Sequence, residues 1–194
     1  MKSITSNEVN LVLQILKNPK QNYNSNSISK ELGISSMGAL KIAKRLEKEG
    51  ILVSKKFGKA IFYSINYKSD YAKHYLSFIL KKQAEQSNPY IKRWISEIRK
   101  VKNADIAILF GSVLFKHDKA NDIDVLFVVS QKNFSELKKE IERVNKINDK
   151  KIHPIYQLGQ DLIENINKED KVVLNAIKGI VVFGEELFLD LLKK

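Results

Sequence analysis

Cysteine is absent from the 194 residues of this chain. Disulfide bonds, thiolate metal sites and a cysteine nucleophile are therefore excluded. Long apolar runs are also missing: residues 125–129 and 180–183, among the longest, fall far short of the roughly 20 residues that a membrane-spanning helix needs. Met1-Lys2-Ser3-Ile4 does not lead into the apolar segment of an export signal. We therefore expect a cytoplasmic protein with no membrane partner.

Acidic residues are scarce in one half of the chain only. The formal net charge is +12, yet residues 1–67 carry 11 basic and 4 acidic residues, residues 68–103 carry 9 and 3, and residues 104–194 carry 14 and 15. A one-sided basic excess is typical of a polyanion binder, because Lys and Arg placed on phosphates release condensed counterions. The alternative is a lysine-rich composition of an AT-biased genome, in which the charge has no partner.

Two helices are predicted at the start of the chain. Apolar residues recur at helical spacing over residues 9–16, and this helix should end before Pro19, because a proline ring clashes with the preceding turn. Ser27 is expected to cap a short second helix over residues 28–32, which Gly33 ends.

A third, longer helix should begin at Ser35 or Ser36 and end at Gly50. Three helices with a glycine in the turn between the last two suggest a helix-turn-helix motif. The apolar stripe expected to face the core of this unit consists of Met37, Leu40, Ala43 and Leu46.

The period then changes from helical to extended. Residues 51–54 and 60–65 are rich in β-branched and aromatic residues, and residues 55–59 supply a glycine-bearing hairpin loop. The pattern "SISKELGIS…LKIAKRLEKEGILVSKKFGKAIFYSIN" resembles the winged-helix domains of prokaryotic transcription regulators, and the likeness covers residues 7–66. It implies that double-stranded DNA is a partner of residues 1–67.

The resemblance also implies which residues contact DNA, because the third helix of a winged helix enters the major groove and the wing reaches phosphates. The alternative is that these side chains only solvate an exposed face, and some winged helices bind protein or RNA instead. The candidate DNA-binding residues are Ser35, Ser36, Lys41, Lys44, Arg45, Lys55, Lys56 and Lys59.

A connector helix is predicted over residues 68–88, with Tyr71, Tyr75, Phe78 and Ile79 on one face. This face fits core packing, and it could also pair two chains. Winged-helix regulators often dimerise through such a connector, so a homodimer is expected by analogy.

Two aspartates follow a Gly-Ser turn in the second half of the chain. Residues 105–110 read as a buried strand that ends in Gly111-Ser112, and Asp122 and Asp124 precede the apolar run 125–129. Alternate residues of a strand share a face, which places the two aspartates about 6.8 Å apart at their backbones. Two such charges repel by roughly 2.4 kcal/mol at an effective dielectric of ~20. No basic residue lies between Lys119 and Lys132, so a divalent cation, Mg²⁺ before others, is expected to offset the repulsion.

Gly111 and Ser112 supply the second half of a phosphate site. Glycine allows close backbone approach, and the serine hydroxyl and free N–H groups can hold phosphate oxygens. Phosphate held by the turn and bridged to a metal on the aspartates fits nucleotidyl or phosphoryl transfer. The segment "ILFGSVLFKHDKANDIDVLFVV" resembles the signature of the polymerase-beta-like nucleotidyltransferase superfamily, and the likeness covers residues 89–194.

The resemblance implies that Gly111 and Ser112 bind a nucleoside triphosphate, while Asp122 and Asp124 are catalytic and ligate Mg²⁺ or Mn²⁺. The implied acceptor is a protein or a small molecule that receives AMP or another nucleotide. Antitoxin-type members of the superfamily modify a toxin, so a toxin-like protein partner is expected on the same ground.

One feature departs from the superfamily pattern. Active members carry a third carboxylate on the next strand, which here is residues 151–158 and has neither Asp nor Glu. Asp149, just before this strand, and His153, within it, could replace the third carboxylate only if they lie close to the aspartates. Loss of a general base lowers rates by ~10²–10⁴, which leaves two outcomes open. One is a slow nucleotidyltransferase, and the other is a transcription regulator whose inactive second domain senses nucleotides or mediates assembly.

The predicted fold class is α+β. A winged helix-turn-helix (1–67) precedes a helical connector (68–88) and a small mixed α/β nucleotidyltransferase-like domain (89–194). In the last domain we also expect a helix over residues 168–178, a strand over 179–183 and a final helix.

Overall fold

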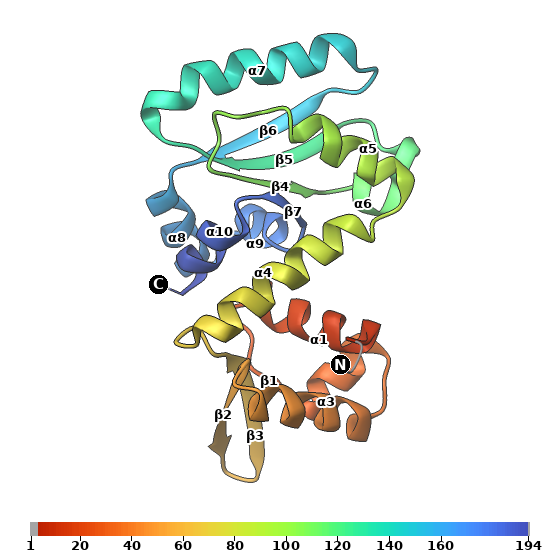
Figure 1. The fold of residues 1–194 in the computed structure, drawn as a ribbon, viewed down its shortest axis with the longest axis vertical. Coiled ribbons are helices and arrows are strands. Elements are labelled where there is room, and N and C mark those ends of the chain that lie inside the picture. The colour runs from red at the N-terminus through yellow and green to blue at the C-terminus, as the bar shows by residue number, and fades with distance from the viewer. Residues whose placement is uncertain (1–3, 194) are drawn as a thin grey trace. The chain divides into compact units, whose positions relative to one another are not determined.

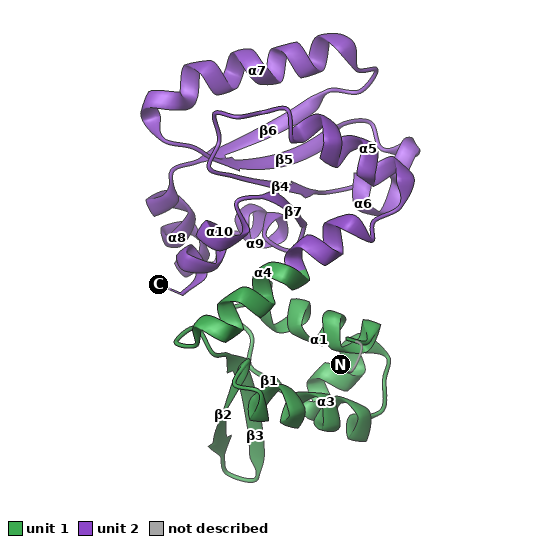
Figure 2. Cartoon of the chain, in the orientation of Figure 1, with its two compact units in different colours: residues 1–79 green, residues 80–194 purple. Residues whose placement is uncertain are grey.

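The computed structural model describes residues 4–193; the first three residues, on which the expectation about an export signal rests, and the last one lie outside it. The chain divides into two compact units, residues 1–79 and 80–194 (Figure 2). The division falls inside helix α4 (Asp70–Glu85), within the predicted connector. Among residues 4–193, no helix is long and apolar enough to cross a membrane.

The first unit has a winged helix-turn-helix arrangement, as predicted. Three helices pack with a three-stranded antiparallel sheet of order β1-β3-β2, and β2 and β3 form the wing (Figure 1). Its elements are α1 (Ser6–Leu16), β1 (Tyr23–Asn24), α2 (Ser25–Leu32), α3 (Ser36–Lys48), β2 (Leu52–Phe57) and β3 (Ala60–Ile65).

The turn between α2 and α3 depends on Gly33, whose φ of 63° lies in the left-handed region that side chains with a Cβ rarely adopt. The turn brings the buried faces of the helices together, and Leu11, Leu16, Ile28 and Leu46 are fully buried. Burial of such a side chain contributes roughly 1.5–3 kcal/mol, so these four residues hold the orientation of α3.

Three local predictions for this unit were wrong. Helix α2 is capped by Asn24 instead of Ser27, because Ser27 sits at the third helical position and completes a capping box with Asn24. Met37 is 61% exposed, and Ala39 takes the buried position in the first turns of α3. Strand β2 runs on to Phe57, so the predicted loop over residues 55–59 is shorter than expected.

The face predicted for α4 is buried only in part, at Ile79 and, less completely, at Tyr75. Tyr71 and Phe78 are 60% and 50% exposed, whereas Ala72, Leu76 and Ile79 are buried. Both sets recur at helical spacing, so periodicity marks two neighbouring faces and does not say which of them is covered.

The second unit is built on a four-stranded mixed sheet of order β6-β5-β4-β7 (Figure 1). Strand β4 is antiparallel to both neighbours, and β5 and β6 run parallel. The elements after α4 are α5 (Pro89–Ile98), β4 (Ile106–Phe110), α6 (Val113–Lys116), a 3₁₀ turn (His117–Lys119), β5 (Ile123–Val128), a second 3₁₀ turn (Gln131–Asn133), α7 (Phe134–Ile147), β6 (Ile152–Gln157), α8 (Gly159–Asn167), α9 (Lys171–Ala176), β7 (Ile180–Phe183) and α10 (Glu185–Leu192).

The central strands are buried on both faces, which explains their continuous apolar sequence. All five residues of β4 are buried. Ala107, Leu109, Val125 and Phe127 join one core cluster with buried residues of α5 and α7, including the fully buried Trp94. Helices α9 and α10 contact β4, and α8 contacts β6. The mixed α/β architecture and the strands predicted for this half of the chain are confirmed.

The helical prediction near the C-terminal end was incomplete. Instead of one helix over residues 168–178, the structure has α8 before it and the shorter α9, which Asp170 caps. Helix α8 carries buried Leu162 and Ile166 four residues apart, and this short period was the available signal.

Candidate functional site

The Gly-Ser turn and the two aspartates meet at one end of the sheet. Phe110, the last residue of β4, pairs with Asp124 near the start of β5. Gly111 has a φ of +80°, and a Cβ at this position would overlap the Asp124 carboxylate. Glycine is therefore required here twice over, once for the backbone angle and once for the close approach of Asp124.

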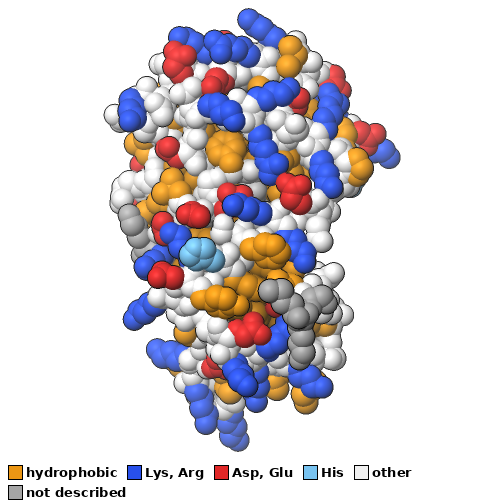
Figure 3. Space-filling model, viewed as in Figure 1, with side chains coloured by type: hydrophobic (Ala, Val, Ile, Leu, Met, Phe, Trp, Pro, Cys, Tyr) orange, Lys and Arg blue, Asp and Glu red, His pale blue; other side chains and the backbone are white. Residues whose placement is uncertain are grey.

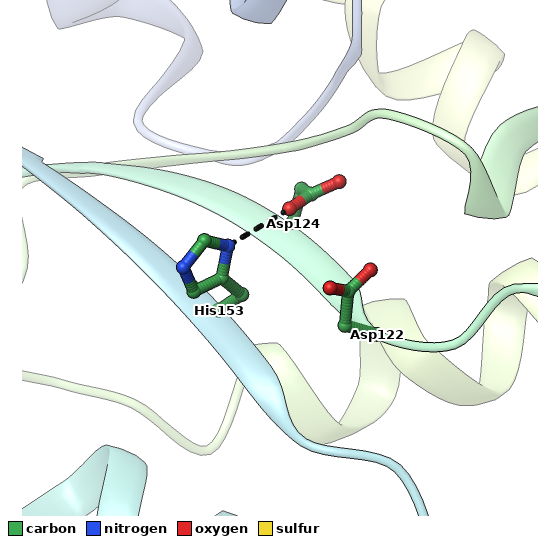
Figure 4. A group of neighbouring side chains, drawn as sticks. All are labelled: Asp122, Asp124 and His153. Atoms are coloured by element: carbon green, nitrogen blue, oxygen red, sulfur yellow. Dashed lines mark hydrogen bonds and ion pairs between the residues drawn. The ribbon is translucent and has the colours of Figure 1, made fainter.

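Asp122, Asp124 and His153 form a single cluster. Figure 4 shows the three side chains on neighbouring strand segments, with Asp124 and His153 linked. One potential ligand atom from each residue lies within 4.8 Å of those of the other two. The predicted convergence of the two aspartates is therefore confirmed, although Asp122 lies just before β5 and not in it.

His153 occupies the strand position at which sequence reasoning looked for a third carboxylate. It is the register partner of Asp124 in the parallel pair of β5 and β6. Its Nδ1 lies 3.2 Å from Asp124 Oδ1, and its side chain is 71% exposed against 24% for Asp124. His153 was one of the two substitutes considered for the third carboxylate, and the sequence does not reveal which strand lies beside β5.

Asp149, the other substitute considered, is engaged elsewhere. Its Oδ1 lies 3.2 Å from an Arg93 nitrogen. A hydrogen bond from the Lys150 backbone, with the Arg93 charge as a further cause, holds the pKa of Asp149 below its usual value. Asp149 is therefore absent from the cluster of potential ligands.

The donor set of the cluster fits a divalent cation. Ligand atoms about 2.1 Å from the same ion lie at most about 4.2 Å apart, so the observed 4.8 Å needs only a small side-chain adjustment. Within residues 4–193, Asp122 makes no side-chain hydrogen bond or ion pair, and Asp124 pairs only with His153. The repulsion between the two carboxylates is thus left largely uncompensated by the chain itself.

Ser112 follows Gly111 directly and precedes the first residue of α6. It is half-buried, and its hydroxyl makes no capping hydrogen bond to the helix that follows. Ser112 does not cap α6 through its side chain, because it has a helical backbone conformation instead of the extended one of a capping residue. Its hydroxyl is left available for a ligand.

The N-terminal end of α3 is held by serines. Ser35 is the N-cap, and its Oγ accepts a hydrogen bond of 3.0 Å from the Gly38 backbone. Ser36 Oγ lies 3.0 Å from Ser29 Oγ and so links α3 to α2. The two candidate serines thus fix the orientation of the third helix.

Most candidate DNA-binding lysines are exposed. Lys41 and Lys44 lie on the open side of α3, and Lys55, Lys56 and Lys59 lie along the wing. In Figure 3, Lys and Arg side chains gather at the tip of the wing, the lower end of the view. This basic surface has the form expected of a phosphate-binding face.

A groove of about 330 Å³ lies within the same unit, between the N-terminal end of α2, α3 and the wing. Its lining includes polar Asn24, Ser25 and Asn26 from the start of α2 and Lys59 from the wing. Tyr63 also lines the groove, and its buried hydroxyl has no hydrogen-bond partner within the described chain. The Asn26 and Ser27 backbone N–H groups already donate to Asn24 Oδ1, so Lys59 is the basic group that lines this groove.

Arg45 differs from the other candidates. Its guanidinium pairs with Glu8 and lies 3.8 Å from Glu49. Glu8 is only 3% exposed and also accepts a hydrogen bond of 2.6 Å from the Tyr75 hydroxyl. Arg45 therefore neutralises a buried carboxylate, and we leave it out of the proposed DNA-contact set.

Comparison with known proteins adds the following findings. No protein-family model matches the sequence, and no curated protein sequence matches it. Among solved structures, the adhesin competence repressor AdcR of Streptococcus pyogenes is 16% identical, with a TM-score of 0.37, over 52% of this chain and 69% of AdcR. The homodimeric winged helix-turn-helix DNA-binding domain Mb0332 of Mycobacterium bovis is 13% identical, with a TM-score of 0.34, over 43% of this chain and 73% of that domain. A ZitR variant of Lactococcus lactis in complex with DNA is 16% identical, with a TM-score of 0.30, over 50% of this chain and 71% of the ZitR chain.

Proposed function

We propose that the second unit binds a nucleoside triphosphate with a divalent cation and transfers a nucleotide to a protein or small-molecule acceptor. The observation that carries the proposal is the meeting of Gly111, Asp122 and Asp124 at one end of the sheet. The turn alone would be a common feature, whereas a turn packed against Asp124, with the Asp122 carboxylate close by, supports a phosphate-and-metal site.

The residues of the chain divide the chemistry between them. Gly111 and Ser112 would hold phosphate oxygens, and Asp122 and Asp124 would ligate Mg²⁺ or Mn²⁺. Such a cation, when bound, supplies Lewis-acid polarisation of the phosphoryl oxygens. In the transfer, an acceptor hydroxyl oxygen bonds to the α-phosphorus while the bond from that phosphorus to pyrophosphate breaks. The hydroxyl proton then needs an acceptor, and the third carboxylate that serves related enzymes is a histidine here.

Incubation with α-labelled triphosphates and Mg²⁺ or Mn²⁺ tests the transfer. We expect label on the protein or on an added acceptor, and loss of that label in the Asp122→Ala, Asp124→Ala double variant. Asp118→Ala is the matched control, because this exposed acid lies in the same loop and outside the cluster. Equal labelling by the double variant and the control would refute the assignment.

We further propose that the first unit binds double-stranded DNA, with α3 in the major groove and the wing on neighbouring phosphates. The exposed lysines of α3 and the wing, and the groove at the start of α2, support this proposal. Affinity for a duplex should fall steeply with salt. The double variant Lys41→Glu, Lys44→Glu should bind the duplex weakly. The double variant Lys171→Glu, Lys178→Glu makes an equal charge change in the second unit and should keep its affinity for the duplex. Salt-independent binding would argue for a protein partner.

A second candidate function is a transcription regulator whose second unit senses a nucleotide without transferring it or mediates assembly into a homodimer. The observation that favours it is the absence of a third carboxylate from β6, where His153 stands instead. Calorimetric titration of triphosphates, with and without Mg²⁺, separates the cases. Binding without labelling supports the sensor, and no binding of any triphosphate eliminates both nucleotide roles and leaves only assembly.

A further inference from the structure

The sheet places His153 next to Asp124, a neighbour that the sequence around His153 does not reveal. Strands β5 and β6 run parallel, and Asp124 and His153 are partners in their register. Side chains at paired positions of neighbouring strands project from the same face, which is why the imidazole stands next to the carboxylate. The histidine is thus brought to the acid pair by the topology of the sheet.

The orientation of the ring is equally specific. Nδ1 faces the aspartates and lies 3.2 Å from Asp124 Oδ1, as Figure 4 shows. The ring is 71% exposed, so packing does not account for its position. Among the described residues, Asp124 is the hydrogen-bonding partner of this side chain.

We propose that His153 is the third protein ligand of the divalent cation and that it makes the site prefer Mn²⁺ to Mg²⁺. The inference deepens the proposed function of the same site. Mg²⁺ favours ligand sets made only of oxygen, whereas imidazole suits first-row transition ions. Replacing the expected third carboxylate by His153 changes the donor set from three oxygens to two oxygens and one nitrogen.

The first test uses Mn²⁺ alone with the full chain, so it does not depend on a nucleotide or on transfer. Pulsed electron paramagnetic resonance of bound Mn²⁺ should show coupling to an imidazole nitrogen, and ¹⁵N labelling of histidine should shift it. The chain has three histidines, so His153→Ala must abolish the coupling while His74→Ala leaves it unchanged. Bound Mn²⁺ without nitrogen coupling, or no Mn²⁺ binding at millimolar concentration, would overturn the inference.

The second test reverses the donor set. His153→Asp should lower the preference for Mn²⁺ over Mg²⁺, measured as the ratio of dissociation constants, by about 10- to 100-fold. His153→Ala should weaken Mn²⁺ binding by a similar factor and Mg²⁺ binding by less. Because His153 is exposed, neither change should disturb folding, which circular dichroism checks. An unchanged ratio in His153→Asp would contradict the proposal.

The two proposals fail separately. Nitrogen coupling without any labelling from triphosphates would keep the His153 ligand and remove nucleotidyl transfer. Labelling that survives in His153→Ala, combined with Mn²⁺ bound through oxygen alone, would keep the transfer and remove the ligand role of His153.

Discussion

The two units present their candidate functions in opposite ways. The first unit spreads positive charge over Lys41, Lys44 and the wing lysines, of which Lys55 alone has a described partner, the Phe57 ring 4.8 Å from its Nζ. The second gathers Asp122, Asp124 and His153 within 4.8 Å against a glycine that nothing else can replace. A distributed surface should lose function gradually under substitution, whereas a convergent site should lose it in one step.

The largest expected effect is therefore a single change in the convergent site. Asp124→Asn removes one charge from the cluster while keeping the shape of a side chain that packs against Gly111. We expect Mn²⁺ affinity to fall roughly 100-fold or more, since loss of a residue that only supports a metal ligand already costs about 10- to 100-fold. Isothermal titration measures this, and Asp118→Asn serves as the control. A loss of less than threefold would show that the cluster does not act as one site.

The distributed surface should respond in proportion to the number of lysines changed. Each exposed lysine that neutralises a phosphate contributes about one unit to the slope of log affinity against log salt. Replacing Lys41, Lys44 and Lys56 by Gln one after another should lower the slope by about one at each step. Fluorescence anisotropy with a duplex measures the slopes. Loss of duplex binding at the first substitution would show that one lysine is essential, which would contradict a distributed surface.

The same contrast determines what the sequence could predict. The wing and the Gly-Ser…Asp-Ile-Asp arrangement have a fixed order and spacing, and the structure places the corresponding elements where they were expected. Contacts between distant segments left no such trace. The pairing of Arg45 with Glu8, 37 residues away, could not be seen in the sequence, which grouped Arg45 with the exposed lysines of α3.

His153 illustrates the limit from the other direction. The sequence placed it on the correct strand, but its role depends on β6 lying parallel to β5 with Asp124 in register. The partly buried face that was predicted for α4 has a related origin, since the helical period recurs for Tyr71 and for Ala72 alike. Local patterns therefore predicted elements, while tertiary pairing decided which side chains act together.

Arg45 lies in the basic unit but, unlike most of its lysines, is held by a specific partner, Glu8. Arg45→Ala leaves the carboxylate of Glu8 buried with only the Tyr75 hydroxyl as a donor. Breaking a buried ion pair from one side costs about 3–5 kcal/mol, and the partial exposure of Arg45 favours the lower end. Hydrogen exchange of first-unit amides should accelerate, while Lys44→Ala should have little effect. Equal amide exchange rates in both variants would mean that Arg45 does not stabilise the first unit and belongs to its exposed basic surface.

The smallest expected effect concerns a lysine of the first unit that takes no part in the basic surface. Lys17 is 4% exposed, and burial lowers its pKa from 10.5 to about 7. Between about pH 7 and 10.5 the unfolded chain therefore binds more protons than the folded chain, and the free energy of unfolding should rise with pH in that window. The slope is at most about 1.4 kcal/mol per pH unit.

The variant Lys17→Met should remove this dependence of stability on pH. Lys30→Met, an exposed change in the same unit, should leave it unchanged. Urea unfolding at pH 7, 8 and 9 measures how the free energy of unfolding changes with pH. The same pH dependence in both variants would mean that Lys17 is charged in the folded unit.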